Sequence, residues 1–374
     1  MSPSSLYIHV PFCARRCPYC DFAVSLQRRP EFREAYVEAV RCEIGGQLRG
    51  ADATMRTIFC GGGTPTELSA LQLNSLLDTV REFAVLAPDA EISLEGNPEN
   101  LSPAMLAELR EGGWNRLSLG AQAFDDETLR FLGRAHDGER IKQVVETARQ
   151  TGWENISLDL MVGAPTQSLS SWEETLRQAG ELGVPHVSAY SLTVENGTAF
   201  GMRESKGAAC VVDDDALADR MDAASTILEG AGLQRYEVAS WARPGWECRH
   251  NENYWRGGDY LAAGSGAHGH RSGFRWWNER DAKVYIRRMQ CEGGAISGSE
   301  ELDETARLVE RIATGIRTRE GFVLQPQELH TLAKPLETLR GAGLIQCDGG
   351  HIWANPSGFA LADGLASCLI GHIL

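Results

Sequence analysis

The chain has 374 residues, of which 43% are hydrophobic and 7% aromatic, proportions typical of a soluble globular protein. Its formal net charge of −15 argues against a nucleic-acid partner or an anionic membrane surface. No apolar run approaches the roughly 20 residues of a membrane-spanning helix, and no signal peptide precedes the first motif. Ten cysteines in a chain of this length are too sparse for a disulfide scaffold. We therefore expect a cytoplasmic protein without an integral membrane segment.

The first motif follows a short apolar run at residues 6–10, which predicts a strand that ends at Pro11. Behind it come Cys13, Cys17 and Cys20, spaced C-x3-C-x2-C, and Pro18 disfavours helix between them. Three thiols on one loop can converge on a soft metal.

A cubic iron–sulfur cluster with one open iron position fits this spacing best, since such clusters normally take four cysteines. Two alternatives stay open. The first is zinc, which would need a fourth ligand from His9 or a distant cysteine. The second is that the three thiols hold no metal.

The next 200 residues alternate apolar strands with amphipathic helices. Such alternation predicts an α/β fold of parallel strands with right-handed crossovers, a partial (β/α)6 barrel. The predicted strands lie at 6–10, 57–60, 91–95, 116–119, 156–161 and 187–192. Helical stripes occupy 40–48, 69–83, 102–112, 125–132, 141–152, a stretch ending near 182 that begins at Ser170 or Ser171, and 214–229.

Unusual side chains cluster where these strands end. The cysteines follow the first strand, Gly61-Gly62-Gly63 follow the second, and Glu95 ends the third. Gln122 comes after the fourth strand and Asp159 is late in the fifth. The carboxyl ends of barrel strands carry the chemistry in such folds, so we expect these residues to share one site.

Composition divides the chain into a barrel at 1–240, a tryptophan- and histidine-rich segment at 241–300, and a C-terminal part at 301–374. The middle segment has poor periodicity, and we expect irregular structure over the barrel mouth. The last part predicts a small winged-helix-like α+β domain with a hairpin around Asp348-Gly349-Gly350. It holds 6 Lys and Arg against 9 Asp and Glu, the wrong sign for nucleic acid.

Motif by motif, the chain resembles the radical S-adenosylmethionine (SAM) superfamily, and within it the branch of oxygen-independent coproporphyrinogen III oxidases. The matching segments cover essentially the whole chain: YIHVPFCARRCPYCDF, FCGGGTPT, LEGNPE, LSLGAQAFDDETLRFLGRAH, ISLDLMVGAPTQ, SAYSLTVENGT, YEVASWARPGWECRHNENYW and GSGAHGH. The resemblance implies a radical SAM barrel with a C-terminal domain of the same branch, and two cofactors, a [4Fe-4S] cluster on Cys13, Cys17 and Cys20, and SAM.

The same resemblance assigns roles to the residues at the strand ends. Glu95 would accept a hydrogen bond from the SAM ammonium, and Arg134 suits its carboxylate because a guanidinium matches a carboxylate fork. Gln122 and Asp159 would bind the ribose hydroxyls. The remaining SAM-site candidates are Tyr7, Gly62, Gly63, Thr64, Ser191 and His268. Taken singly, several of these would be ordinary surface residues or helix caps.

Within the branch, the chain resembles heme chaperones more than dehydrogenases. A dehydrogenase has a further cysteine two residues after the third ligand, where this chain has Phe22, and a longer segment before Tyr7. The resemblance thus implies binding of heme and its delivery to acceptor hemoproteins, with respiratory ones as candidates. The alternative is an enzyme, an oxygen-independent coproporphyrinogen III oxidase or another radical SAM enzyme that modifies tetrapyrroles.

The candidate heme ligand is His250, which opens the segment HNENYW. A neutral imidazole binds heme iron, and Tyr254 and Trp255 would stack on the macrocycle. A structural histidine with satisfied hydrogen bonds is the competing interpretation. His270 is a weaker candidate ligand.

Overall fold

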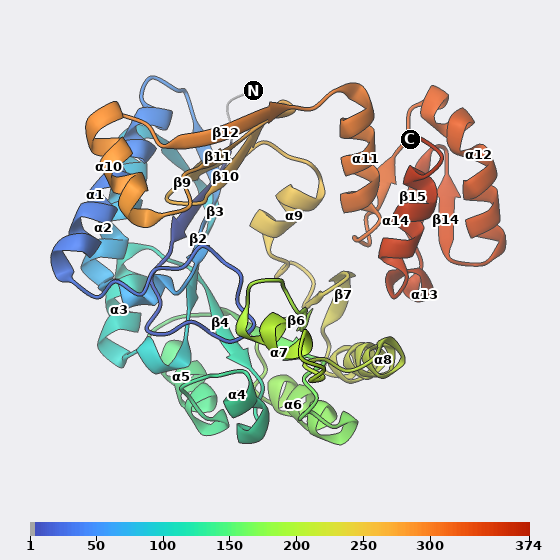
Figure 1. Cartoon of the computed structure of the whole chain (residues 1–374), viewed down its shortest axis with the longest axis horizontal. Coiled ribbons are helices and arrows are strands. Elements are labelled where there is room, and N and C mark those ends of the chain that lie inside the picture. The colour runs from blue at the N-terminus through green and yellow to red at the C-terminus, as the bar shows by residue number, and fades with distance from the viewer. Residues whose placement is uncertain (1–3) are drawn as a thin grey trace.

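The computed structural model describes residues 4–374 and has a large sheet with helices on its outer side, next to a smaller unit formed by the end of the chain (Figure 1). The predicted parallel barrel is confirmed. Strands β1 to β6 lie side by side in chain order, and all five neighbouring pairs are parallel. The strands are β1 (Ser5–Val10), β2 (Thr54–Gly62), β3 (Val85–Gly96), β4 (Arg116–Gln122), β5 (Asn155–Val162) and β6 (His186–Ser191).

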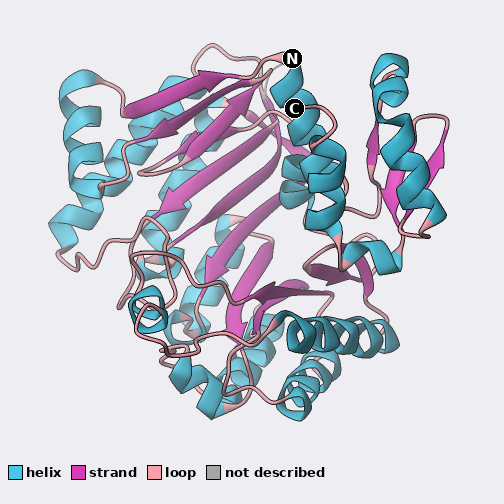
Figure 2. Cartoon of the chain, turned by 45° about the vertical axis from the view of Figure 1, so that its right-hand side comes forward, coloured by secondary structure: helices cyan, strands magenta, loops and turns pink. Residues whose placement is uncertain are grey.

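Helices connect these strands and cover the convex face of the sheet (Figure 2). The apolar stripes of most of these helices form one continuous buried core with those of the strands, and α4 and α7 contribute to a second, smaller cluster. The helices are α1 (Pro30–Leu48), α2 (Ala70–Phe83), α3 (Pro103–Gly112), α4 (Asp126–Phe131), α5 (Gly138–Gln150), α6 (Leu169–Glu181), α7 (Ala199–Glu204) and α8 (Asp214–Gly230), with short 3-10 turns η1 (Pro65–Glu67) and η2 (Pro98–Asn100).

Two helix starts show how well local signals place an element. Ser69 caps α2, and its capping box with Gln72 is present as predicted. The predicted cap of α6 at Ser170 or Ser171 is wrong, because Ser168 caps it by accepting from the Ser171 backbone N–H. Three serines within four residues offer equivalent caps, and sequence alone does not rank them.

The expectation of irregular structure between 241 and 300 is also wrong. β9 (Leu261–Ala263) adds to the barrel sheet beside β1, parallel to it, and β7 (Gln234–Glu237) and β8 (Ser240–Ala242) extend the other edge. The rest holds α9 (Arg249–Trp255), an antiparallel sheet of β10 (His268–Arg271), β11 (Phe274–Asn278) and β12 (Ile296–Glu301), and α10 (Ala282–Glu292). Three- and four-residue strands are too short to show periodicity.

The C-terminal unit has its own buried core, and its predicted α+β character is confirmed. The predicted hairpin is present, with Gly349 and Gly350 at φ of +56° and +93° in the two-residue turn. The elements are α11 (Glu304–Gly315), β13 (Phe322–Val323), α12 (Pro326–Gly341), β14 (Ile345–Asp348), β15 (His351–Ala354), α13 (Pro356–Phe359) and α14 (Ala362–Ile370). None of the helices described between residues 4 and 374 has the length and apolarity needed to cross a bilayer.

Candidate functional site

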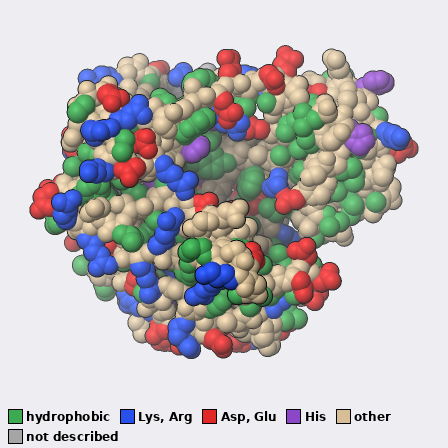
Figure 3. All heavy atoms as spheres, in the orientation of Figure 1, with side chains coloured by type: hydrophobic (Ala, Val, Ile, Leu, Met, Phe, Trp, Pro, Cys, Tyr) green, Lys and Arg blue, Asp and Glu red, His purple; other side chains and the backbone are tan. Residues whose placement is uncertain are grey.

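A cavity of about 1290 Å³ opens at the carboxyl ends of β1 to β6, larger than the roughly 300–1,000 Å³ of a typical small-molecule site. Figure 3 shows the hollow near the centre of this face. Every residue predicted to bind the cluster or SAM lines it, so the fold brings together side chains from seven segments. They are Tyr7, Cys13, Cys17, Cys20, Gly62, Gly63, Thr64, Glu95, Gln122, Arg134, Asp159, Ser191 and His268.

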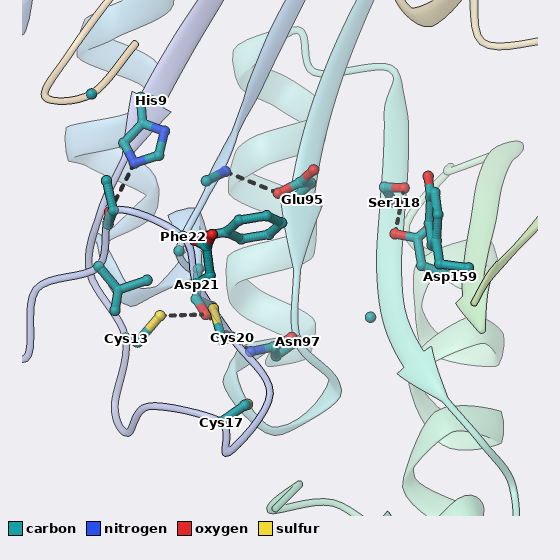
Figure 4. A pocket seen from close by; sticks show the side chains of 18 of the residues that line it. His9, Cys13, Cys17, Cys20, Asp21, Phe22, Glu95, Asn97, Ser118 and Asp159 are labelled. Carbon is teal, nitrogen blue, oxygen red and sulfur yellow. Dashed lines mark hydrogen bonds between the residues drawn. The ribbon is translucent and has the colours of Figure 1, made fainter. Parts of the chain in front are cut away.

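The cysteine loop is closed at its base by backbone hydrogen bonds. The Ser25 N–H donates to the Pro11 carbonyl at 2.7 Å, and the Cys13 N–H donates to the Ser25 carbonyl at 3.1 Å. Burial raises the pKa of the Cys13 thiol to about 11, so without a metal this cysteine stays protonated. Figure 4 shows the three cysteines on this one loop.

The thiols share the cavity but do not meet at one point. Nowhere in residues 4–374 do three His, Cys, Asp or Glu side chains come together closely enough to hold a metal ion. Convergence of the ligands at such a site is coupled to binding of the cation itself. Three soft donors on one closed loop facing one cavity fit a [4Fe-4S] cluster with an open iron.

The glycine run at the end of β2 is fixed by close packing on β1 and the start of the cysteine loop. Gly62 has φ of +118°, and a Cβ there would lie 2.5 Å from the His9 ring. A Cβ on Gly63 would lie 2.6 Å from the Pro11 carbonyl oxygen, which is backbone and cannot rotate away. Only glycine allows this approach, so the run is more than an ordinary turn.

Asn97 is a site residue that the sequence analysis missed. Its amide donates to Thr64 Oγ1 at 3.0 Å, and its carbonyl accepts from Arg134 Nη2 at 2.5 Å. Arg134 also donates to the Gly120 carbonyl at 3.1 Å and contacts Cys17 Sγ at 3.7 Å. Asn97 thus links the predicted carboxylate-binding guanidinium to the glycine loop. Its place two residues after Glu95 in the EGNP segment was the available signal.

Two partly buried carboxyl groups give the site its electrostatic character. Burial, with the charge of Asp159, raises the pKa of Glu95 to about 8, although Glu95 accepts from the Gly62 N–H at 3.1 Å. Burial raises the pKa of Asp159 to about 6, against a 2.8 Å hydrogen bond from Ser118. Both bonds are drawn in Figure 4. A cationic ammonium beside Glu95 would restore its charge, so this side chain fits the proposed SAM partner.

Gln122 carries backbone strain at the end of β4. Its φ is +66°, a left-handed value that is uncommon for a residue with a side chain. The register between β4 and β5 shifts between Leu119 and Gln122. Strain of this kind costs about 1–3 kcal/mol and collects at binding sites, which supports a functional role for this side chain.

Aromatic and imidazole rings also line the cavity. His268 stacks on Trp277 with centroids 5.9 Å apart, and burial lowers the pKa of this histidine. The Tyr7 hydroxyl lies 3.0 Å from His9 Nδ1, and His9 Nε2 donates to the Ala23 carbonyl at 3.0 Å. Tyr7 is therefore partly buried and held in place, as a residue beside a cofactor would be.

His250 is separated from the cavity by one side chain. Its Nε2 lies 2.7 Å from the hydroxyl of Tyr254, which lines the cavity, and its Nδ1 lies 2.8 Å from Thr57 Oγ1. The imidazole is fully buried, and burial together with the Arg116 charge lowers its pKa to about 3. His250 is thus a neutral imidazole with both nitrogens paired in this conformation.

The neighbours of His250 face different ways. Tyr254 faces the cavity, whereas Trp255 lines a separate pocket of about 290 Å³ next to Arg319 and Glu320. Trp255 therefore does not share a surface with Tyr254, although the sequence placed them together. His270 accepts from the Gly273 N–H at 3.1 Å, so both of its nitrogens are also engaged.

The barrel, the cysteine loop and the strand-end residues together define the radical SAM class of proteins. Comparison with known proteins agrees. The Radical SAM superfamily model matches residues 7–179. The chain is 37% identical over 372 residues to the heme chaperone HemW of Mycobacterium tuberculosis, covering 99% of this chain and 95% of that one. It is 42% identical over 270 residues to the heme chaperone HemW of Escherichia coli, covering 72% and 70%.

Among solved structures, the coproporphyrinogen III oxidase HemN of Escherichia coli, described as a radical SAM enzyme, superposes with a TM-score of 0.85 at 25% identity. The match covers 98% of this chain and 90% of that one. The chain belongs to the HemW family. Membership implies a [4Fe-4S] cluster and SAM as cofactors, and the residues gathered here fit both groups.

Proposed function

We propose that this protein is a cytoplasmic heme chaperone, which binds heme beside a cluster- and SAM-loaded barrel and delivers it to acceptor hemoproteins. Two features together carry the proposal. The cavity is larger than one small ligand needs, and the neutral imidazole of His250 lies directly behind its wall, in contact with Tyr254. All ten cysteines are unpaired, which supports a reducing compartment.

The cofactor residues divide along the cavity. Cys13, Cys17 and Cys20 would hold the cluster, and Glu95 and Arg134 would hold the two charged ends of the methionyl group. The bound cluster and SAM supply redox and sulfonium chemistry in this family. The protein's own contribution is to orient the sulfonium ligand through these charges and to exclude water with the buried walls of the barrel.

The heme-binding part would be built around α9. Phe59 stacks on His250 with centroids 5.3 Å apart, and Tyr254 and Tyr260 pack edge to face at 4.5 Å. Phe59, Tyr254 and Tyr260 line the cavity, so a flat apolar macrocycle would find aromatic contacts there. Iron would reach Nε2 of His250 once the Tyr254 hydroxyl leaves it.

The test is a titration of the cluster-reconstituted protein with heme under anaerobic conditions, with and without SAM. We expect a Soret band at a fixed 1:1 ratio, which His250→Ala weakens or shifts. His270→Ala is the matched control, because His270 is also paired at both nitrogens but lies on β10. An unchanged spectrum and affinity in His250→Ala would remove His250 as the ligand, and absence of heme binding by the wild type would refute the proposal.

The superposition on HemN favours one competing function, oxidation of coproporphyrinogen III. Phe22 occupies the position where such an enzyme carries a further cysteine, and this side chain is 65% exposed in the cavity wall. We therefore expect no protoporphyrinogen IX when the reconstituted protein is incubated with SAM, a reductant and coproporphyrinogen III. Turnover above the level of a Cys17→Ala variant would establish the enzymatic function instead.

A further inference from the structure

The deep end of the cavity holds a buried arginine without a partner. Arg116 is 2% exposed and lines the cavity, yet its Nε and Nη1 atoms have no hydrogen-bond partner. No ion pair to Arg116 forms within residues 4–374. Buried donors of a charged group that lack an acceptor are costly, and proteins normally satisfy them.

The acids around Arg116 are committed elsewhere. Glu91 accepts from the backbone N–H groups of Arg249 and His250 at 3.0 and 3.2 Å. Asp159 accepts from the hydroxyls of Ser118 and Ser157. Their charges act on Arg116 through space, but neither places an oxygen on the guanidinium. The cationic group therefore keeps its hydrogen-bond donors for another acceptor.

Arg116 also lies deeper along β4 than the predicted SAM residue Gln122, although the charges of Glu95 and Asp159 reach it. It is the first residue of β4 and Gln122 is the last, so the two are separated by six residues, or about 20 Å along an extended strand. Both line the same cavity. The cavity thus has two polar ends, and the predicted carboxylate partner of SAM, Arg134, belongs with Gln122 at the outer one.

The walls between these ends suit an apolar ligand. Phe59 and Tyr254 line the cavity and both contact His250. Arg116 pairs with Ser93 of β3, two residues from Glu91, whose carboxylate accepts from the His250 N–H. Arg116 is thus close to the imidazole and to the aromatic wall. A guanidinium deep behind aromatic side chains is suited to a ligand that carries a carboxylate on an apolar body.

We propose that Arg116 is the anchor for a propionate carboxylate of the bound tetrapyrrole, which enters the barrel with that acidic edge first. This inference rests on the proposed heme-binding function and adds to it an orientation and a specificity-determining residue. The carboxylate accepts from the guanidinium donors that the free protein leaves buried without a hydrogen-bond partner. Esterified or decarboxylated tetrapyrroles lack this contact.

The experiment uses metal-free porphyrins, so that axial ligation does not contribute. Cluster-reconstituted full-length protein with SAM is titrated anaerobically with protoporphyrin IX and with its dimethyl ester, and binding is followed by porphyrin fluorescence in one detergent-containing buffer. We expect the wild type to bind the diacid at least about tenfold more tightly than the ester, the effect of one charge-assisted hydrogen-bonded pair.

Arg116→Met should remove that preference while leaving the affinity for the ester unchanged, and Arg116→Lys should keep part of it. Arg280→Met is the matched control, because Arg280 lines the same cavity at its exposed mouth and pairs with Asp21. It should keep the preference. Circular dichroism and melting of each variant verify folding, and the wild-type preference tests the proposal if Arg116→Met fails to fold.

Three results would overturn the inference. They are equal binding of diacid and ester by the wild type, an unchanged preference in folded Arg116→Met, and equal loss of preference in Arg116→Met and Arg280→Met. In each case the protein still binds the macrocycle, so the proposed function survives. Failure of the wild type to bind either porphyrin, and heme as well, refutes the proposed function itself.

Discussion

Glu91, on β3, accepts a hydrogen bond at 3.2 Å from the backbone N–H of His250, which lies in the first turn of α9. The same carboxylate accepts from the Arg249 N–H at 3.0 Å. Cys248 precedes this helix and makes no side-chain cap. A barrel strand therefore supplies the N-terminal cap of the helix that carries the candidate heme ligand, and its negative charge also suits the positive end of the helix.

Removal of this cap should destabilise the protein strongly. In Glu91→Ala, two buried N–H groups lose their acceptor, and we expect the free energy of unfolding to fall by about 2–4 kcal/mol. Asp89→Ala is the control, because Asp89 also binds Arg249, through an exposed ion pair at 3.0 Å, and its loss should cost less than about 1 kcal/mol. Urea unfolding measures both. Equal stabilities would show that Glu91 does not hold α9.

The glycine run should be indispensable for the metal site. In Gly63→Ala the new Cβ would meet the Pro11 carbonyl, so the cysteine loop must move. We expect a loss of about 1–3 kcal/mol and failure to reconstitute the cluster, measured as bound iron and sulfide.

The matched control for Gly63→Ala is Gly46→Ala on α1. A Cβ at Gly46 meets nothing within 4 Å, and alanine favours helix by up to about 1 kcal/mol. This variant should melt at or above the wild-type temperature and take up iron normally. Normal iron content in Gly63→Ala would contradict the packing argument.

The sequence predicted the positions of Glu95 and Asp159 in one cavity because parallel strands place their carboxyl ends at one edge, whatever lies between them in the chain. It did not predict Asn97, whose role depends on Thr64 and Arg134 meeting at one place. Contacts of this kind are set by tertiary packing, and no local pattern encodes them. For the same reason β9 was missed, since its three residues join the sheet only through β1.

His250 shows a second limit of sequence reasoning. The motif marked it as a candidate ligand, and the alternative was a histidine with satisfied hydrogen bonds. In the structure the ring is buried and paired to Thr57 and Tyr254, as the second description requires, and its role as a ligand stays a prediction. The hydrogen-bonded state and an iron-bound state differ in the partner of Nε2, which is Tyr254 in the first and iron in the second. A sequence motif carries no information on which of the two is populated.

Stability should respond to pH through Glu95. An unfolded glutamic acid titrates near pH 4.3, whereas the folded group has a pKa of about 8. Between these values the folded state binds more protons, so this group contributes stability that is fully present below about pH 4 and is lost as the pH rises through 8. In the absence of SAM, Glu95→Gln should therefore gain melting temperature relative to wild type between pH 6 and pH 9.

Glu99→Gln is the control for Glu95. Burial raises the pKa of Glu99, but the His136 hydrogen bond at 3.0 Å, a backbone hydrogen bond and the charge of Arg134 together outweigh burial and lower it. The contribution of Glu99 to stability is complete above about pH 5. The difference in melting temperature between Glu99→Gln and wild type should therefore be constant from pH 6 to pH 9. If the difference in melting temperature between Glu95→Gln and wild type were also constant over this range, Glu95 would already be ionised.

Thr57 should tune the candidate heme ligand without touching heme. We assign the Tyr254 phenol as donor to Nε2 and Nδ1–H as donor to Thr57 Oγ1. Thr57 then fixes the tautomer in which Nε2 is the basic nitrogen, as partners of metal-bound histidines do.

Thr57→Val should weaken heme affinity about tenfold, in the range measured for such partners, and shift the Soret band. Thr79→Val, a buried threonine on α2 that pairs with Arg41 at 2.9 Å, should change neither quantity. Equal heme spectra and affinities for Thr57→Val and wild type would show that the imidazole is not the ligand or does not depend on this hydroxyl.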